Sequence, residues 1–186
     1  DPMDVRYNVI NWVHRATRGW SYGSSVVDPR TGEIIKGHVT LGSLRVRQDY
    51  LIALGLTSPF KEGNTDTTAQ QEMALDRIRQ LSAHEVGHTL GIAHNFAASE
   101  NNRASVMDYP HPKISIKNGK ISLEGAYDKG IGAWDIHAVE YGYQDFASDV
   151  EEAEALAKII VKGRNEGLSF KSDPDTRSSR HASANG

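Results

Sequence analysis

The residues best able to do chemistry lie in one short segment, residues 84–94, which reads His-Glu-Val-Gly-His-Thr-Leu-Gly-Ile-Ala-His. The spacing H-E-x-x-H-x-x-G-x-x-H supplies three imidazoles, one carboxylate and one glycine. On an α-helix, His84 and His88 are one turn apart and therefore lie on the same face. Three neutral nitrogen donors that leave one coordination position open are typical of a catalytic zinc site. The segment therefore predicts bound Zn²⁺ as the cofactor.

The other residues of the motif have distinct predicted roles. Glu85 is rotated by about 100° from His84 around a helix axis, so we expect a general base that hydrogen-bonds a zinc-bound water, and no metal ligand. His94 would point about 240° away from His88 if the helix continued, so the chain must leave the helix between them. Gly91 is the expected turn, because glycine enters the left-handed conformation without a Cβ clash. The predicted zinc ligands are thus His84, His88 and His94.

A second ligand set remains open. Glu100 could complete a site of two histidines and one glutamate, but His94 lies nearer in the chain and Gly91 explains how it turns back. We therefore prefer the set of three histidines.

The elements that must position the motif begin with one long helix. Asp66 or Thr67 can cap it, because short polar side chains accept hydrogen bonds from the first turn. Its expected apolar positions run into the zinc motif and are Ala74, Leu75, Ile78, Leu81 and Val86. Residues 7–13 predict a strand, and residues 24–27 and 33–41 predict a hairpin around a turn that contains proline and glycine.

The C-terminal half predicts a hairpin and two helices. Residues 113–117 and 120–123 flank Asn118-Gly119, a strong two-residue hairpin signal. Helices are expected over residues 134–141 and 151–164. The predicted domain covers residues 1–171, with an upper part of 1–91 and a lower part of 92–171 that holds this hairpin. A loosely ordered tail is expected over residues 172–186, where Ser, Asp, Arg, Gly and Asn follow without periodicity.

Composition narrows the classes of partner. The chain has 186 residues, a net charge of −3 and no basic stripe, so nucleic acid is not an expected partner. No run approaches the roughly 18 apolar residues of a membrane helix. There is no cysteine, which excludes thiolate ligands. The abrupt start of the chain suggests a domain excised or processed from a longer protein, so flanking domains are expected.

Residues 105–109 read Ser-Val-Met-Asp-Tyr, and together with the zinc motif they resemble the metzincin metalloproteases. The resemblance implies that Met107 belongs to a Met-turn, which lies as a hydrophobic floor beneath the three histidines. It also implies that Tyr109 either binds zinc or stabilises the oxyanion of the reaction. The alternatives are an ordinary core methionine and a tyrosine that only packs beside Pro110.

The chain resembles more narrowly the bacterial Met-zincin domain of large zinc-dependent metalloproteases. Residues 19–34, 37–42 and 94–99 carry this likeness, which spans most of residues 5–170. It implies an α+β, metzincin-like (zincin) fold: a twisted mixed sheet, a long active-site helix and a smaller, mainly irregular or helical lower subdomain. It also implies export to the periplasm, the cell surface or the medium. Asn95 departs from several metzincin branches, which place an acidic or other signature residue there.

Two further site predictions follow. The edge strand that pairs with an extended peptide substrate is expected at His38, Val39, Thr40, Leu41 and Gly42, with an interior strand as the alternative. Asp108 could orient a zinc-bound histidine by accepting a hydrogen bond.

The function that these residues predict is zinc-dependent hydrolysis of peptide bonds, with a peptide or protein as substrate. Glu85 would take a proton from the zinc-bound water as that water attacks the peptide carbonyl, and Tyr109 would assist. The alternative is a catalytically inactive, zinc-bearing scaffold or binding module of a larger protein.

Overall fold

Helices and a small sheet together make this an α+β protein. The computed structural model describes every residue except 16, 18, 64 and 177–186. The chain divides into two units, which are described separately below. Unit 1 comprises Asp1–Gly91 and His111–Gly130, and unit 2 comprises Ile92–Pro110 and the residues from Ile131 onward. The expected α+β class is confirmed.

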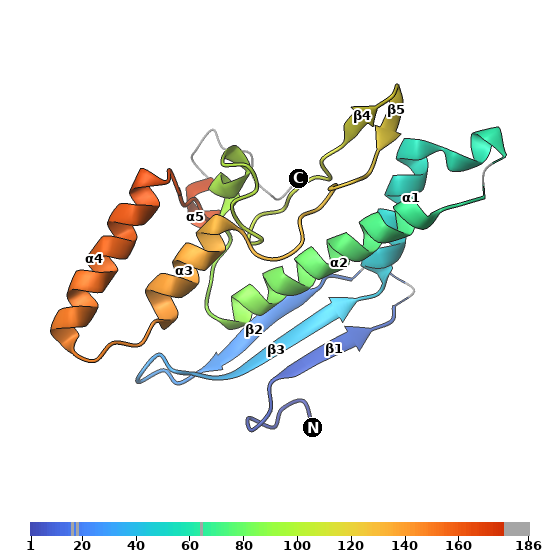
Figure 1. Cartoon of the computed structure of the whole chain (residues 1–186). Helices are drawn as coiled ribbons and strands as arrows, with labels where there is room; N and C mark the ends of the chain where they lie inside the picture. The colour runs from blue at the N-terminus through green and yellow to red at the C-terminus, as the bar shows by residue number, and fades with distance from the viewer. Residues whose placement is uncertain (16, 18, 64, 177–186) are drawn as a thin grey trace. The chain divides into compact units, whose positions relative to one another are not determined.

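Unit 1 is built on a mixed three-stranded sheet with the strand order β1-β3-β2. Strand β1 (Val9–Val13) runs parallel to β3 (Ile34–Gly42), whereas β2 (Tyr22–Val27) runs antiparallel to β3. The β2–β3 connection is the expected hairpin, whose turn is closed by bonds from the Arg30 and Gly32 N–H groups to Asp28. Figure 1 shows the three strands side by side beneath one long helix.

The predicted substrate edge strand is wrong, because β3 is the central strand of the sheet. The whole predicted segment pairs with β1 on one side, and its first three residues also pair with β2 on the other. The segment consists of His38, Val39, Thr40, Leu41 and Gly42. Their backbone groups are therefore engaged in the sheet. The edges are β1 and β2. The β2–β3 hairpin follows from local turn residues, but β1 lies far from β3 in the sequence, and periodicity does not predict that it pairs with the open side of β3.

Two helices complete the upper part of unit 1, with a short 3-10 turn η1 (Pro59–Glu62) between them. Helix α1 (Leu44–Thr57) packs against α2 (Thr68–Thr89), and α2 lies across one face of the sheet (Figure 1). The N-cap of α2 is Thr67, whose side chain makes no capping hydrogen bond. The carboxylate of Asp66, one residue before the cap, accepts bonds from the Thr68 N–H at 2.9 Å and the Thr68 hydroxyl at 2.6 Å. Of the two predicted caps, Thr67 holds the position without a side-chain bond, and Asp66 bonds the first residue of the helix from outside it.

The C-terminal hairpin belongs to unit 1 and not to the lower part, where we expected it. Strands β4 (Ser115–Lys117) and β5 (Lys120–Ser122) are joined by Asn118 and Gly119, which both have positive φ as the turn signal predicts. The physical reason for its placement is a shared core. This core contains Ala53 of α1, Met73 of α2 and, after the hairpin, Leu123, Ala126 and Tyr127.

Unit 2 consists mainly of helices. After the 3-10 turn η2 (Phe96–Glu100) come α3 (Ala133–Tyr143), α4 (Asp149–Asn165) and a single turn, α5 (Asp173–Thr176). Helices α3 and α4 pack side by side (Figure 1). A Cβ at Gly163 would lie 2.5 Å from the His137 ring, so this contact requires glycine.

The first residues of the expected loose tail are ordered. Residues 172–176 are placed, Ser172 is buried and residues 173–176 form α5. Residues 177–186 lie outside the described part of the chain. No helix of the described residues is long and apolar enough to cross a membrane.

Candidate metal centre

The last turns of α2 bring two of the predicted zinc ligands together. The His84 and His88 Nε2 atoms lie 3.1 Å apart, and their rings meet edge to face. His84 is buried and His88 is half-buried. Since two protonated nitrogens would repel each other at this distance, at least one of them presents a lone pair toward the other. A pair of ring nitrogens that converge on one point is suited to sharing a metal ion.

Glu85 has an unusual environment for a carboxylate. It is 4% exposed, and burial raises the pKa of its side chain from the ordinary 4.5 to about 7. A hydrogen bond with the Gly23 backbone and the positive charge of Arg77 offset part of this rise. A carboxylate with a pKa near neutral can both accept and release a proton at physiological pH.

Strand β2 approaches α2 at Glu85 so closely that only glycine fits. A Cβ at Gly23 would lie 1.9 Å from the Glu85 carbonyl oxygen. Gly23 has no positive φ, so the requirement is one of space and not of backbone conformation. The β2 edge of the sheet is therefore held directly against the predicted catalytic residue.

The charge of Arg77 belongs to a buried network in unit 1. Arg77 donates a hydrogen bond to Gln80 and lies 5.4 Å from the centre of the Tyr127 ring. Burial lowers the pKa of Arg77, and the nearby positive charge of Arg45 lowers it further. Arg45 in turn binds the fully buried Asp49 through two hydrogen bonds of 2.7 and 3.0 Å. The network thus keeps a cation near Glu85.

The helix ends where the motif predicts. Thr89 is the last residue of α2, and Gly91 has a φ of 78°. The Gly91 N–H still donates to the His88 carbonyl at 3.1 Å, after which the chain enters unit 2. A non-glycine residue at this φ would strain the backbone.

In unit 2, both ring nitrogens of His94 have partners. Nδ1 lies 2.9 Å from an oxygen of the Asp173 carboxylate, and Nε2 lies 2.8 Å from the Tyr109 hydroxyl. The Tyr109 and Phe96 rings both lie beside the imidazole. His94 is therefore held in a defined orientation.

The predicted Met-turn is tied to the residue after His94. The Asn95 N–H donates to the Met107 carbonyl at 2.9 Å, and the Met107 N–H donates to the Ser105 hydroxyl at 2.8 Å. The Met107 side chain is almost fully buried. These contacts lie within unit 2 and fix the segment that carries Tyr109.

The sequence reasoning missed Asp135, which holds the predicted Met-turn segment, residues 105–109, in place. Its carboxylate accepts bonds from the Gly132 N–H at 2.7 Å, the Ser105 hydroxyl at 2.5 Å and the Val106 N–H at 2.8 Å. The first of these bonds caps α3. Gly132 has no side chain to complete a capping box, so the sequence offered only a weak signal for this residue, an acidic side chain in the first turn of the helix.

The predicted role of Asp108 is not observed. Its carboxylate accepts bonds from the Ser99 hydroxyl and from the Tyr109 N–H, so it braces the Met-turn segment. The carboxylate that reaches a motif histidine is that of Asp173. Sequence reasoning overlooked it because it lies 79 residues from His94.

Among the described residues, the group of side chains able to hold a metal ion is His84, His88 and His94, each through one ring nitrogen. The alternative ligand Glu100 is not part of it. Three imidazoles without a thiolate form a donor set that suits Zn²⁺, and the facing Nε2 atoms of the α2 pair fit a shared ion.

A family model described as Met-zincin matches residues 66–186, which is more than half of the chain and contains the histidine triad and the Met-turn segment. The chain belongs to the Met-zincin family. The resemblance found in the sequence is thereby confirmed, although the match begins at α2 and does not include the three-stranded sheet. No curated protein and no solved structure matched this Met-zincin.

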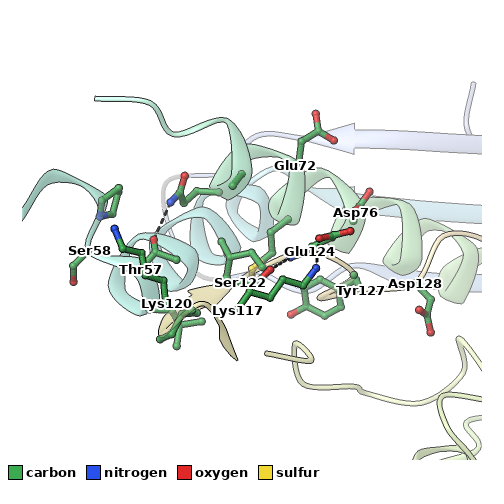
Figure 2. Close-up of a pocket in the computed structure, with 18 of the residues that line it drawn as sticks. Thr57, Ser58, Glu72, Asp76, Lys117, Lys120, Ser122, Glu124, Tyr127 and Asp128 are labelled. Atoms are coloured by element: carbon green, nitrogen blue, oxygen red, sulfur yellow. Dashed lines mark hydrogen bonds and ion pairs between the residues drawn. The ribbon is translucent and has the colours of Figure 1, made fainter. Parts of the chain in front are cut away.

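A separate hollow of about 1070 Å³ lies in unit 1, where the β4–β5 hairpin meets α1 and the start of α2 (Figure 2). Charged side chains of both signs surround it, including Glu72, Asp76, Lys117 and Lys120. None of the residues predicted to bind metal or to act in catalysis lines it. The hollow is therefore distinct from the histidine motif.

Proposed function

We propose that this Met-zincin is a zinc-dependent peptidase with a zincin-type fold. The observation that carries the proposal is the histidine triad, in a family named for this chemistry, next to a buried glutamate of raised pKa. His84, His88 and His94 would hold the ion through ring nitrogens. When bound, Zn²⁺ would acidify water and polarise the scissile carbonyl.

Glu85 is the proposed general base. Its carboxylate accepts a proton from the attacking water as the water oxygen adds to the peptide carbonyl carbon. The same carboxyl group then delivers this proton to the leaving amine nitrogen as the C–N bond breaks. Burial supports this double role, because it raises the pKa of Glu85 to about 7.

Tyr109 is the proposed oxyanion stabiliser. Its hydroxyl lies 2.8 Å from His94 Nε2, the nitrogen that would face the metal, and the side chain is 42% exposed. A phenol at this position can donate a hydrogen bond to the oxygen that becomes negative during attack. The same position also suits a role as an additional metal ligand.

The substrate strand is reassigned to β2. This strand pairs with β3 on one side and, among the described residues, with no strand on the other. It is also the strand that Gly23 brings against Glu85. An extended peptide could add to its free edge through backbone hydrogen bonds, which would make the enzyme tolerant of substrate sequence.

The test uses the zinc-loaded chain and a mixture of denatured proteins, with and without a chelator. Mass spectrometry of the new termini should show cleavage that the chelator abolishes and that Glu85→Gln lacks while still binding zinc. Turnover retained in Glu85→Gln would refute the assigned base. Zinc binding without any chelator-sensitive cleavage would refute the peptidase and favour the alternative, a zinc-bearing binding module.

A further inference from the structure

The C-terminal segment 169–176 makes contacts that the proposed function does not use. Helix α4 ends at Asn165, and the chain then returns to His94, so that Asp173 reaches the His94 ring. We propose that Asp173 is a positioning residue for the third zinc ligand, and that segment 169–176 is therefore part of the metal centre. This inference rests on the metal site of the proposed function.

The contact determines which nitrogen of His94 is available. An ionised carboxylate can only accept hydrogen bonds, so His94 Nδ1, 2.9 Å from the Asp173 oxygen, must carry the proton. In the neutral imidazole, Nε2 then presents its lone pair. This is the nitrogen that faces the Tyr109 hydroxyl at 2.8 Å. Asp173 thus selects the tautomer able to bind a metal through Nε2.

Asn95 holds the segment beside His94. This side chain is fully buried, and its amide group donates to the Ser169 carbonyl at 2.9 Å. Its amide oxygen accepts bonds from the Lys171 N–H at 3.1 Å and the Ala97 N–H at 3.2 Å.

A backbone bond from the Phe96 N–H to the Lys171 carbonyl, at 2.8 Å, completes the link between the two segments. Asn95 follows His94 directly in the chain, so the residue that anchors the segment also fixes its distance from the ligand. Asn95 is also where this sequence departs from several metzincin branches. The departure therefore has a structural consequence, because an acidic side chain could not donate to the Ser169 carbonyl.

The short helix α5 holds the backbone that carries Asp173. The Ser172 N–H donates to the Asp175 carboxylate at 3.0 Å, and the Asp175 N–H donates to the Ser172 carbonyl at 2.9 Å. The Thr176 hydroxyl donates to the Asp173 carbonyl at 2.8 Å. Asp173 is thus held on an ordered turn, although its side chain is about half exposed.

The test measures zinc affinity of the full chain by competition with a chromophoric chelator. Removal of a carboxylate that supports a histidine ligand typically lowers metal affinity about 10- to 100-fold. We expect this loss in Asp173→Ala. Asp173→Asn should lose less, because the amide oxygen still accepts from Nδ1–H. The matched control is Glu154→Ala, which removes the same charge from an exposed position on α4 and should bind zinc as the wild type does.

A spectroscopic measurement separates positioning from general stability. With Co²⁺ as the probe, the visible absorption of Asp173→Ala should differ from that of the wild type, while Glu154→Ala should not differ. The unfolding temperature in excess chelator should be similar in all variants. If Asp173→Ala does not fold, the zinc affinity and the Co²⁺ spectrum of Asp173→Asn test the proposal in its place.

The proposal is overturned if the zinc affinity of Asp173→Ala lies within twofold of that of Glu154→Ala, or if the Co²⁺ spectra coincide. Two outcomes distinguish failure of this proposal from failure of the proposed function. Zinc binding that depends on Asp173 without any peptide cleavage would refute the peptidase alone. Chelator-sensitive cleavage together with unchanged affinity in Asp173→Ala would refute the role of Asp173 alone.

Discussion

Asp135 offers a quantitative test of how the Met-turn is held. The carboxylate is 3% exposed and accepts three hydrogen bonds, two of them from the buried residues Ser105 and Val106 and one from Gly132. Asp135→Ala removes the acceptor and leaves these donors without it. The Gly132 N–H is partly accessible and can turn to water, whereas the other two donors cannot easily do so.

The expected loss follows from the two buried donors. A buried donor without a partner costs about 1–3 kcal/mol, so the two together predict a loss of about 4 kcal/mol in the free energy of unfolding. For a chain of this size, 1 kcal/mol corresponds to roughly 2–4 °C, so the unfolding temperature should fall by about 8–16 °C. Asp135→Asn keeps one oxygen acceptor and should lose roughly half as much.

The assay is thermal unfolding followed by circular dichroism, in excess chelator so that metal binding does not contribute. Asp145→Ala is the control, because this exposed aspartate in unit 2 accepts only a local bond from the Phe146 N–H. A loss below about 1 kcal/mol in Asp135→Ala would refute the reasoning. It would mean that the buried donors find other partners and that the Met-turn does not depend on this carboxylate.

Three further predictions test the site. Because burial raises the folded-state pKa of Glu85 to about 7 from an ordinary 4.5, the metal-free protein should lose stability as pH rises through this window, by at most about 3 kcal/mol. Glu85→Gln should remove this loss, and parallel unfolding-temperature profiles between pH 4 and 8 would contradict the assigned shift. Gly23→Ala, whose Cβ would meet the Glu85 carbonyl oxygen at 1.9 Å, should cost about 1–3 kcal/mol in chemical denaturation and reduce peptidase activity. Gly55→Ala has nothing within 4 Å and should be neutral or stabilising, so equal effects of the two changes would argue against the clash. Asn95→Asp should cost about 1–3 kcal/mol in thermal unfolding, because it replaces the donor to the Ser169 carbonyl with an acceptor; an unchanged unfolding temperature would show that this bond is dispensable.

The sequence by itself determined the features that depend on near neighbours in the chain. Helical spacing places His84 and His88 on one face of α2, and Gly91 ends the helix with a positive φ because only glycine adopts that conformation without strain. Asn118 and Gly119 form the predicted turn because asparagine and glycine are the residues that most readily adopt the positive φ that a two-residue hairpin turn requires. Each of these features follows from steric rules that act within a few residues.

Only the tertiary structure decided the features that join distant segments. Strand β3 became the central strand because β1 and β2 both pair with it, which moved the candidate substrate edge from residues 38–42 to β2. Asp173 reaches His94 from 79 residues away. Asp135 reaches Ser105 and Val106 from about 30 residues away. Periodicity carries no information over such separations, because a hydrogen bond between two segments depends on how the intervening chain packs and not on how far apart the residues lie in sequence.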